Sequence, residues 1–197
     1  MDWKDQGLTI DVAVHVGTLG AVLAYLWREV WMMFCGIGKL ATGKVDEGAK
    51  LAGLVIIASI PVVIAGLAVK TYFGEGLRTP VIIGWAFIVG GVLLYLGDRY
   101  GLRIKKMAHI TVGNALLIGV AQAFAVIPGA SRAGTTITMA RLLGFERRDA
   151  ARFSMLLSIP AIAGAGLLQG MEVVQSGDAA FQANILIVAG LAFVTAL

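Results

Sequence analysis

The stretch AVIPGASRAGTTIT, residues 125–138, decides how this chain folds. It places a proline, two glycines, a serine, an arginine and three threonines at the end of the apolar run Val112–Ile127. Residues of these types are typical of a solvated loop, or of an anion site inside a membrane. The surrounding sequence distinguishes between these two interpretations.

The composition predicts an integral membrane protein. Of the 197 residues, 58% are hydrophobic and 14% charged, and the mean hydropathy is +0.86. Soluble domains average about 45–50% apolar and about 25% charged residues. The net charge of +4 is explained better by basic cytoplasmic loops than by nucleic-acid binding. The single cysteine, Cys35, excludes an internal disulfide and a cysteine-based zinc site.

Apolar runs suited to membrane helices follow one another along the chain. A straight span takes about 20 residues, with about 17 as the lower bound. We therefore expect an all-α integral membrane protein, a multi-span helical bundle that forms a single membrane domain over 1–197. Val30–Ile37 either extends the first run or forms a short interfacial piece. The runs are Val12–Trp27, Leu51–Val69, Val81–Leu96, Val112–Ile127, Phe153–Leu168 and Ile185–Leu197.

Basic residues are unevenly distributed among the connecting segments. Segments 28–50, 98–110 and 141–152 hold four each, whereas 70–80 holds two and 170–182 holds none. Because cytoplasmic loops are enriched in Lys and Arg, the first three segments are predicted to be cytoplasmic and the last two external.

The stretch between the second and third basic segments must then cross the membrane an even number of times. With Pro128, Gly129 and Gly134 at its middle, we predict a broken, re-entrant hairpin at about 112–140. The alternative is a pair of short complete spans joined by an external polar turn. Irregular backbone at membrane depth occurs only where protein buries it or a wet cavity adjoins it, and an ionisable residue there indicates a functional site.

The residues at the hairpin tip suit a phosphoryl group. Arg132 offers forked donors and stays charged in a poorly hydrated site. If a helix starts near Ala133, its N–H groups and dipole point at the same place. Ser131, Thr135 and Thr136 add hydroxyls that can bind phosphate oxygens, and a Ser or Thr near a base can act as a nucleophile.

Two other kinds of phosphate site are disfavoured, the P-loop and the histidine-dependent site of the membrane acid phosphatases. Gly129 to Thr136 has the glycine spacing of a P-loop, but Thr135 occupies the lysine position and no strand precedes it. The two histidines, His15 and His109, lie in an apolar run and after a basic cluster, so neither is assigned a catalytic role.

The stretch GVAQAFAVIPGASRAGTTIT, Gly119 to Thr138, resembles the second signature of the bacterial undecaprenyl-pyrophosphate phosphatases, also called bacitracin-resistance proteins. Their pattern there is close to Q-x-x-A-x-x-P-G-x-S-R-S-G-x-T. Asp11–Arg28 and Phe153–Gly166 resemble the helices that follow the family's two signatures, so the resemblance covers nearly the whole chain. The matching residues are Gln122, Ala125, Pro128, Gly129, Ser131, Arg132, Gly134 and Thr136.

This resemblance implies a multi-pass enzyme of the bacterial cytoplasmic membrane, built from two inverted re-entrant repeats. Such enzymes hydrolyse undecaprenyl pyrophosphate, a polyprenyl pyrophosphate lipid, to undecaprenyl phosphate and phosphate. The product is the lipid carrier recycled for peptidoglycan synthesis, which links the family to bacitracin resistance. The resemblance also implies Mg²⁺ or Ca²⁺ as a cofactor. It implies nothing about the oligomeric state.

Carried over to this chain, the resemblance assigns roles to the tip residues. Arg132 would bind the pyrophosphate, Ser131 would bind or attack phosphorus, and Thr136 would hydrogen-bond a phosphate oxygen; these three are the predicted catalytic residues. The predicted substrate-binding residues are Gln122, which would support the tip, Pro128, Gly129, Gly134 and Thr135.

The chain departs from the family pattern at two places. Ala133 replaces the family's second serine. The acidic first signature, which resembles E-x-x-x-E-F-L-P-x-S-S-x-G-H-L, is not found, and the last apolar run stops short. We therefore expect a fragment truncated at both ends, with part of one inverted repeat missing, no metal ligands of its own, and weak or no activity alone. A polyprenyl-phosphate carrier or flippase that does not hydrolyse its cargo is the alternative function.

Overall fold

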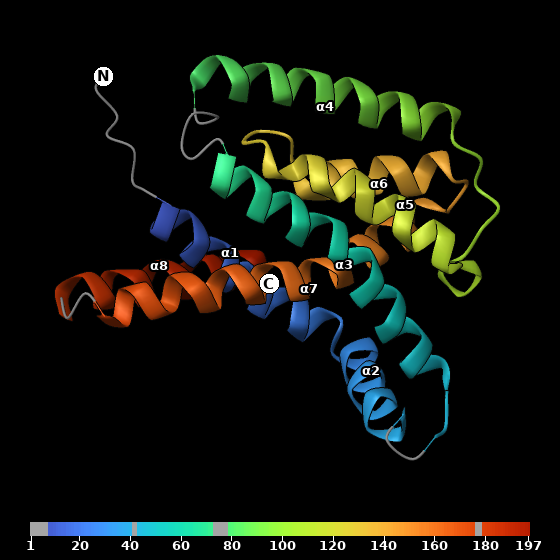
Figure 1. The fold of residues 1–197 in the computed structure, drawn as a ribbon, viewed down its shortest axis with the longest axis horizontal. Helices are drawn as coiled ribbons and strands as arrows, with labels where there is room; N and C mark the ends of the chain where they lie inside the picture. Colours follow the sequence, from blue (N-terminus) through green and yellow to red (C-terminus); the bar gives the residue numbers. More distant parts are fainter. Residues whose placement is uncertain (1–7, 41–42, 73–78, 176–178) are drawn as a thin grey trace. The chain divides into compact units, whose positions relative to one another are not determined.

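The computed structural model describes residues 8–40, 43–72, 79–175 and 179–197. These residues form eight α-helices and two short 3₁₀-helices, and they contain no β-strand beyond one isolated bridge between Lys105 and Phe145 (Figure 1). The helices are α1 (Leu8–Tyr25), α2 (Trp27–Leu40), α3 (Glu47–Tyr72), α4 (Pro80–Tyr100), η1 (Met107–His109), α5 (Val112–Ala123), η2 (Phe124–Val126), α6 (Arg132–Leu142), α7 (Arg147–Gln175) and α8 (Ala179–Ala196).

Three of the described helices are long and apolar enough to cross a bilayer: Glu47–Val69, Pro80–Tyr100 and Arg147–Leu168. Large apolar side chains cover the outside of α4, where Trp85 is 64% exposed. A surface of this kind is unfavourable in water and suits contact with lipid. The prediction of an all-α membrane protein is therefore confirmed.

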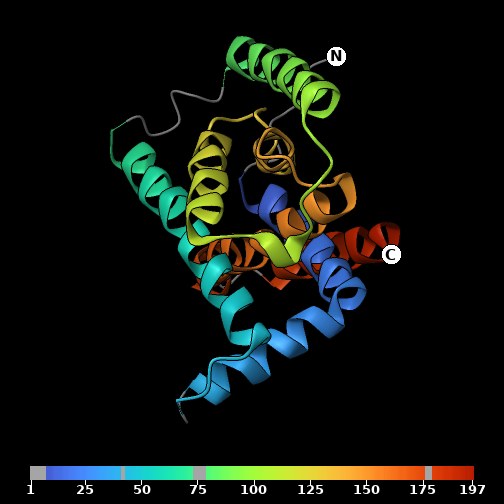
Figure 2. The ribbon, with the colours of Figure 1, turned by 90° about the vertical axis from the view of Figure 1, so that its right-hand side faces the viewer.

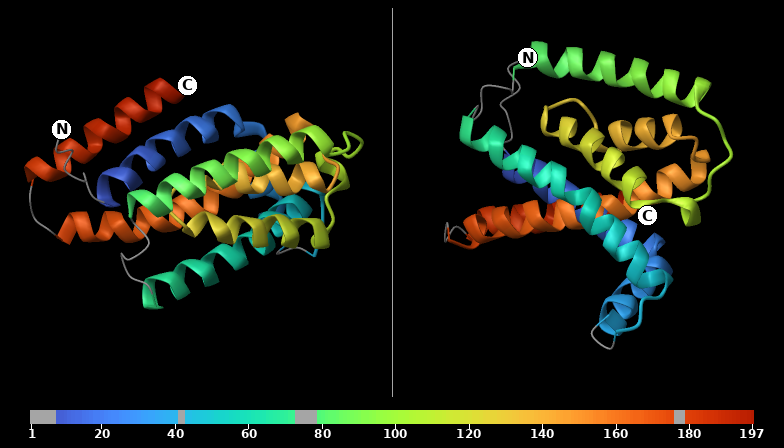
Figure 3. Two further views of the ribbon diagram at one scale, coloured as in Figure 1. Left: turned by 90° about the horizontal axis from the view of Figure 1, so that it is seen from above. Right: turned by 45° about the vertical axis from the view of Figure 1, so that its right-hand side comes forward.

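The chain folds into two compact units, Met1–Trp31 with Ser158–Leu197, and Met32–Leu157. In the first unit, α1 packs against α8 (Figure 3). Gly17 of α1 lies against the backbone of Ala189, and Gly20 lies against the ring of Phe193. Small residues at such a crossing let two helices approach closely.

The second unit contains the predicted hairpin. Its helices lie in the order α3, α5, α6, α4, with each one packed on the next (Figure 2). Gly119 of α5 lies against the backbone of Ala58 in α3, and Gly97 of α4 lies against Thr138 of α6. The hairpin arms α5 and α6 therefore lie between two longer apolar helices.

The segment 28–50, predicted as a cytoplasmic loop, contains the separate helix α2 and the start of α3. Asp46 marks that start, because its carboxylate accepts a hydrogen bond from the Ala49 N–H at 2.9 Å. The same carboxylate pairs with the Lys39 ammonium at 2.8 Å. An acceptor at this position satisfies a backbone donor that has no partner within the helix.

The Lys39 partner and the Ala49 N–H lower the pKa of Asp46 below its ordinary value of 3.8. A carboxylate with a lowered pKa stabilises the fold above that ordinary value, and the stabilisation disappears as the pH falls through the lowered pKa. We expect wild type to melt at a higher temperature than Asp46→Asn at pH 7, with the difference shrinking as the pH falls below 3.8. Thermal unfolding in detergent at several pH values measures this difference. A difference that persists in acid would contradict it.

Candidate active site

The tip of the hairpin lies beside the length of α4. A side chain at Gly129 would overlap the backbone of Ile83, and one at Gly90 would lie 3.5 Å from the carbonyl oxygen of Ala130. At 1.5 Å per residue, the tip lies about 5–15 Å from the start of a helix about 30 Å long. Neither α5, with 12 residues, nor α6, with 11, is long enough to cross a hydrocarbon core of about 30 Å.

Both ends of the hairpin lie at the C-terminal end of α4. The Ile104 and Lys105 N–H groups, in the connection from α4 to η1 and α5, donate to the carbonyl oxygen of Gly144, just after α6, at 3.1 and 3.0 Å. Gly101, at the end of α4, lies against the backbone of Arg141. The chain therefore enters and leaves the hairpin at the same end, as a re-entrant segment does, and the depth of the tip in a bilayer stays a prediction.

Ser131 begins α6 with an unusual backbone. Its φ of 53° makes it the only non-glycine residue with positive φ in the part of the chain that the structure describes. Its hydroxyl accepts a hydrogen bond from the Gly134 N–H at 3.2 Å, which caps the helix. Such strained backbone persists where surrounding structure enforces it, and it is found preferentially at functional sites.

Arg132 and Gln122 contain polar atoms without partners. Nη1 of Arg132 and both amide atoms of Gln122 are buried, and none has a hydrogen-bond partner among the described residues. Gln122 is fully buried near the end of α5. Buried donors left unpaired are costly, and the guanidinium and amide groups are donors that suit phosphate oxygens.

Thr136 is buried away from the open tip. Its hydroxyl lies 2.7 Å from the Ser154 hydroxyl of α7 and donates to the carbonyl oxygens of Arg132 and Ala133. In this arrangement Thr136 joins α6 to α7, while its predicted contact with a phosphate oxygen is not tested. Ser154 was not singled out from the sequence, because a serine within an apolar run carries no motif.

The other predicted residues shape the turn between the two arms. Pro128 precedes Gly129, which has a φ of +92°. Gly134 lies under the Ser131 side chain, and the Thr135 hydroxyl donates to the Arg132 carbonyl at 3.0 Å. These four residues lie at or next to the tip, and their predicted role in substrate binding remains a prediction.

Gly129→Ala tests whether this turn is required. A methyl group there would meet the backbone of Ile83 at a positive φ. We expect the free energy of unfolding to fall by about 1–3 kcal/mol, as measured by denaturant titration in detergent. Gly53→Ala is the control, because Gly53 has open space around it and alanine favours helices. Equal stability of the two variants would contradict the prediction.

Arg141 holds the opposite end of the hairpin. The sequence places it among the charges of a cytoplasmic loop, yet the structure buries it completely. Its guanidinium donates to the Asp98 carboxylate at 3.1 Å and to the carbonyl oxygens of Asp98, Gly101, Leu102 and Phe145. Arg147 also pairs with the Asp98 carboxylate. Arg141 thus joins the end of α4 to the turn after α6, where carbonyl groups lack helical partners.

Side chains that could bind a divalent cation are not clustered among the described residues. They contain no cluster of three or more His, Cys, Asp or Glu residues, and residues 112–140 include no Asp or Glu. Mg²⁺ and Ca²⁺ are bound chiefly by carboxylate and other oxygen ligands. The hairpin thus offers donors for an anion but no carboxylate for a metal.

Comparison with known proteins identifies the family of this chain. The model of the family described as bacitracin resistance protein BacA matches residues 1–197. A protein of Jannaschia sp. named undecaprenyl-diphosphatase is 47% identical over 98% of this chain and 73% of its own length. Proteins of Ruegeria pomeroyi and Rhodospirillum rubrum, named undecaprenyl-diphosphatase and undecaprenyl-diphosphatase 1, are each 46% identical over 98% of this chain. They are covered over 73% and 69% of their own lengths. The chain therefore belongs to the BacA family of bacitracin resistance proteins.

Proposed function

We propose that this chain is an undecaprenyl-diphosphatase that crosses the bacterial cytoplasmic membrane several times. Water adds to the terminal phosphorus of undecaprenyl pyrophosphate, the bond from that phosphorus to the bridging oxygen breaks, and undecaprenyl phosphate and inorganic phosphate leave. The names of relatives that are 46–47% identical support this reaction. The reaction returns the lipid carrier to peptidoglycan synthesis and opposes bacitracin.

The observation that carries the proposal is Nη1 of Arg132 at the start of α6, which is buried and has no hydrogen-bond partner among the described residues. The first N–H groups of a helix have no intrahelical acceptors, and the helix dipole adds positive potential there. Arg132 and the start of α6 therefore bind the terminal phosphate together. They also hold the charge that develops on its oxygens in the transition state.

The remaining tip residues support this arrangement. The Ser131 oxygen already accepts the Gly134 N–H, so its own hydrogen is available for a phosphate oxygen. Attack by Ser131 on phosphorus would use the second lone pair of this oxygen, since the first accepts the Gly134 N–H. Gln122 supports the tip from α5, and Thr136 keeps α6 against α7 through Ser154. Pro128, Gly129, Gly134 and Thr135 shape the backbone that surrounds the phosphates.

A polyprenyl-phosphate carrier is the second candidate, and the acid-free hairpin favours it. Residues 112–140 supply an anion site but no carboxylate to act as a general base. Such a site can hold a headgroup during movement across the membrane without cleaving it.

Two parallel assays separate the two candidates. One measures phosphate release from undecaprenyl pyrophosphate by the purified chain in detergent, and the other measures transport of a labelled polyprenyl phosphate in vesicles. We expect slow release of phosphate that disappears in Arg132→Ala. Transport without release would favour the carrier, and the absence of both would contradict both. Mg²⁺, Ca²⁺ and a chelator are compared in the same assay, since a divalent cation belongs to the proposal although the described residues do not hold one.

A further inference from the structure

An apolar groove begins at the tip of the hairpin. Its cavity volume is about 350 Å³, and α4, α5 and α6 form its walls. Ala130 and Thr135 lie at one end and Leu142 at the other. Along α6, the distance from Thr135 to Leu142 is about 10 Å at 1.5 Å per residue.

The walls of the groove offer almost no polar groups. On α4 it is lined by Ala86, Val89, Gly90 and Leu93, which share one face of the helix at helical spacing. Its two threonines, Thr135 and Thr138, donate their hydroxyls to carbonyl oxygens of their own helix, at 3.0 and 2.7 Å.

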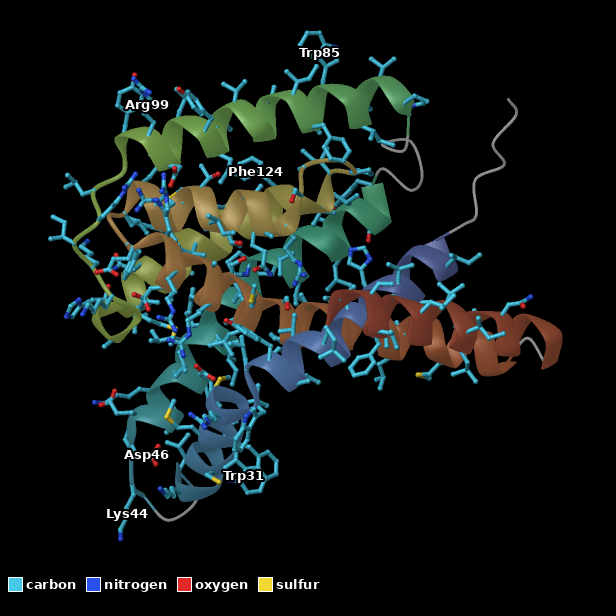
Figure 4. All side chains as sticks on the ribbon, turned by 180° about the vertical axis from the view of Figure 1, so that it is seen from behind. Trp31, Lys44, Asp46, Trp85, Arg99 and Phe124 are labelled. Carbon is cyan, nitrogen blue, oxygen red and sulfur yellow. The ribbon has the colours of Figure 1, made fainter. Side chains whose placement is uncertain are left out.

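Phe124 of η2 lies inside the groove, and the outer face of α4 lies outside it. Phe124, which lines it, lies between α4 and α6, whereas Trp85 points away from the outer side of α4 (Figure 4). Gly90 contributes no side chain, and a Cβ there would meet only the Ala130 carbonyl oxygen, at 3.5 Å. The groove therefore owes part of its space to this glycine, directly beside the tip.

We propose that this groove binds the first isoprene units of the polyprenyl chain while the pyrophosphate lies at Arg132. The inference rests on the function proposed above and adds the site of the hydrocarbon tail. A volume of about 350 Å³ lies within the range of about 300–1,000 Å³ typical of ligand sites. The groove is continuous with the tip at Ala130 and Thr135, so one molecule occupies both. The rest of a long tail extends into the bilayer.

Photocrosslinking locates the tail without requiring turnover. The probe is a farnesyl diphosphate that carries a diazirine on its first isoprene unit, added to the wild-type chain in detergent. We expect crosslinks at Leu93, Ala130 and Thr135, the part of the groove nearest the tip, and their loss when excess undecaprenyl pyrophosphate competes. Crosslinks only outside the groove would overturn the proposal. Groove crosslinks that undecaprenyl pyrophosphate does not reduce would also overturn it, because they would indicate a groove that takes up any membrane lipid.

Filling the groove tests the same proposal by affinity. Gly90→Leu should weaken binding of undecaprenyl pyrophosphate about tenfold, the loss expected when burial of about two methylene groups is withdrawn. Binding of inorganic pyrophosphate, which has no tail, should not change. Gly84→Leu is the matched control, because Gly84 lies on the same helix with open space around it and outside the groove. Equal effects of the two substitutions on lipid binding would contradict the proposal.

The two claims fail in different ways. The groove proposal alone is wrong if binding of inorganic pyrophosphate depends on Arg132, but the probe does not crosslink in the groove and Gly90→Leu does not weaken lipid binding. If wild type binds neither pyrophosphate nor the lipid, the proposed function is wrong. Thermal unfolding of each variant confirms that it is folded.

Discussion

Arg132→Ala is expected to reduce phosphate release from undecaprenyl pyrophosphate by about 10²–10³-fold, the usual effect of removing a donor that stabilises transition-state charge. The guanidinium lies at the start of α6 and has a buried Nη1 without a partner among the described residues. No other arginine or lysine lies in the segment 112–140, so no second basic side chain of this segment supplies this charge.

Arg132→Lys separates charge from geometry. Lysine keeps the positive charge but cannot form two parallel hydrogen bonds to one phosphate. We expect its kcat/KM to lie between those of Arg132→Ala and wild type, in a steady-state assay of released phosphate. Arg103→Ala, at an exposed position before α5, is the matched control for loss of one arginine. Wild-type activity in Arg132→Ala would place the phosphate elsewhere in the molecule.

Arg141→Met is expected to lower the free energy of unfolding by about 3–5 kcal/mol, the range found when one partner of a buried charged network is removed. The substitution keeps an apolar stem but leaves the carbonyl oxygens of Gly101, Leu102 and Phe145 without their donor. It also removes one of the two arginines that pair with Asp98. Buried acceptors that lose their partner account for most of the expected effect.

Denaturant unfolding in detergent measures this loss, with Arg148→Ala as the control. Arg148 belongs to the same basic segment but is exposed, so its removal should change stability little. Arg147→Ala should have a smaller effect than Arg141→Met, because the Arg147 side chain is 61% exposed. If Arg141→Met and Arg148→Ala unfold alike, the network does not hold the hairpin to α4.

Patterns among neighbouring residues predict the all-α fold class and the region of the candidate site. The apolar runs predict the regions of the long helices α3, α4 and α7, although only the run Leu51–Val69 exceeds the lower bound for a span. The break at Pro128 and Gly129 predicts the separation of α5 from α6, because neither residue favours a helix interior. Ser131 and Arg132 lie where the motif predicts, at the start of a helix, because a serine cap depends mainly on the next three residues.

Contacts between distant residues could not be read in this way. Arg141 counts as one more loop charge until the end of α4 brings three carbonyl oxygens and a carboxylate around it. Ser154 acquires its role only because α7 places it 2.7 Å from Thr136. The first apolar run, predicted over Val12–Trp27, is divided, because α1 ends at Tyr25 and Trp27 begins the separate helix α2.

By itself, the sequence determined that this chain forms apolar helices with a polar, glycine-containing break that carries Ser131 and Arg132. Hydropathy and capping depend on neighbouring residues, so a linear pattern records them. The tertiary structure alone decided that α4 lies beside the break, that a groove opens at Gly90, and that Arg141 is buried. These features depend on which helices pack together. The hydrophobic effect is non-directional, so the apolar pattern of one helix does not specify its partner.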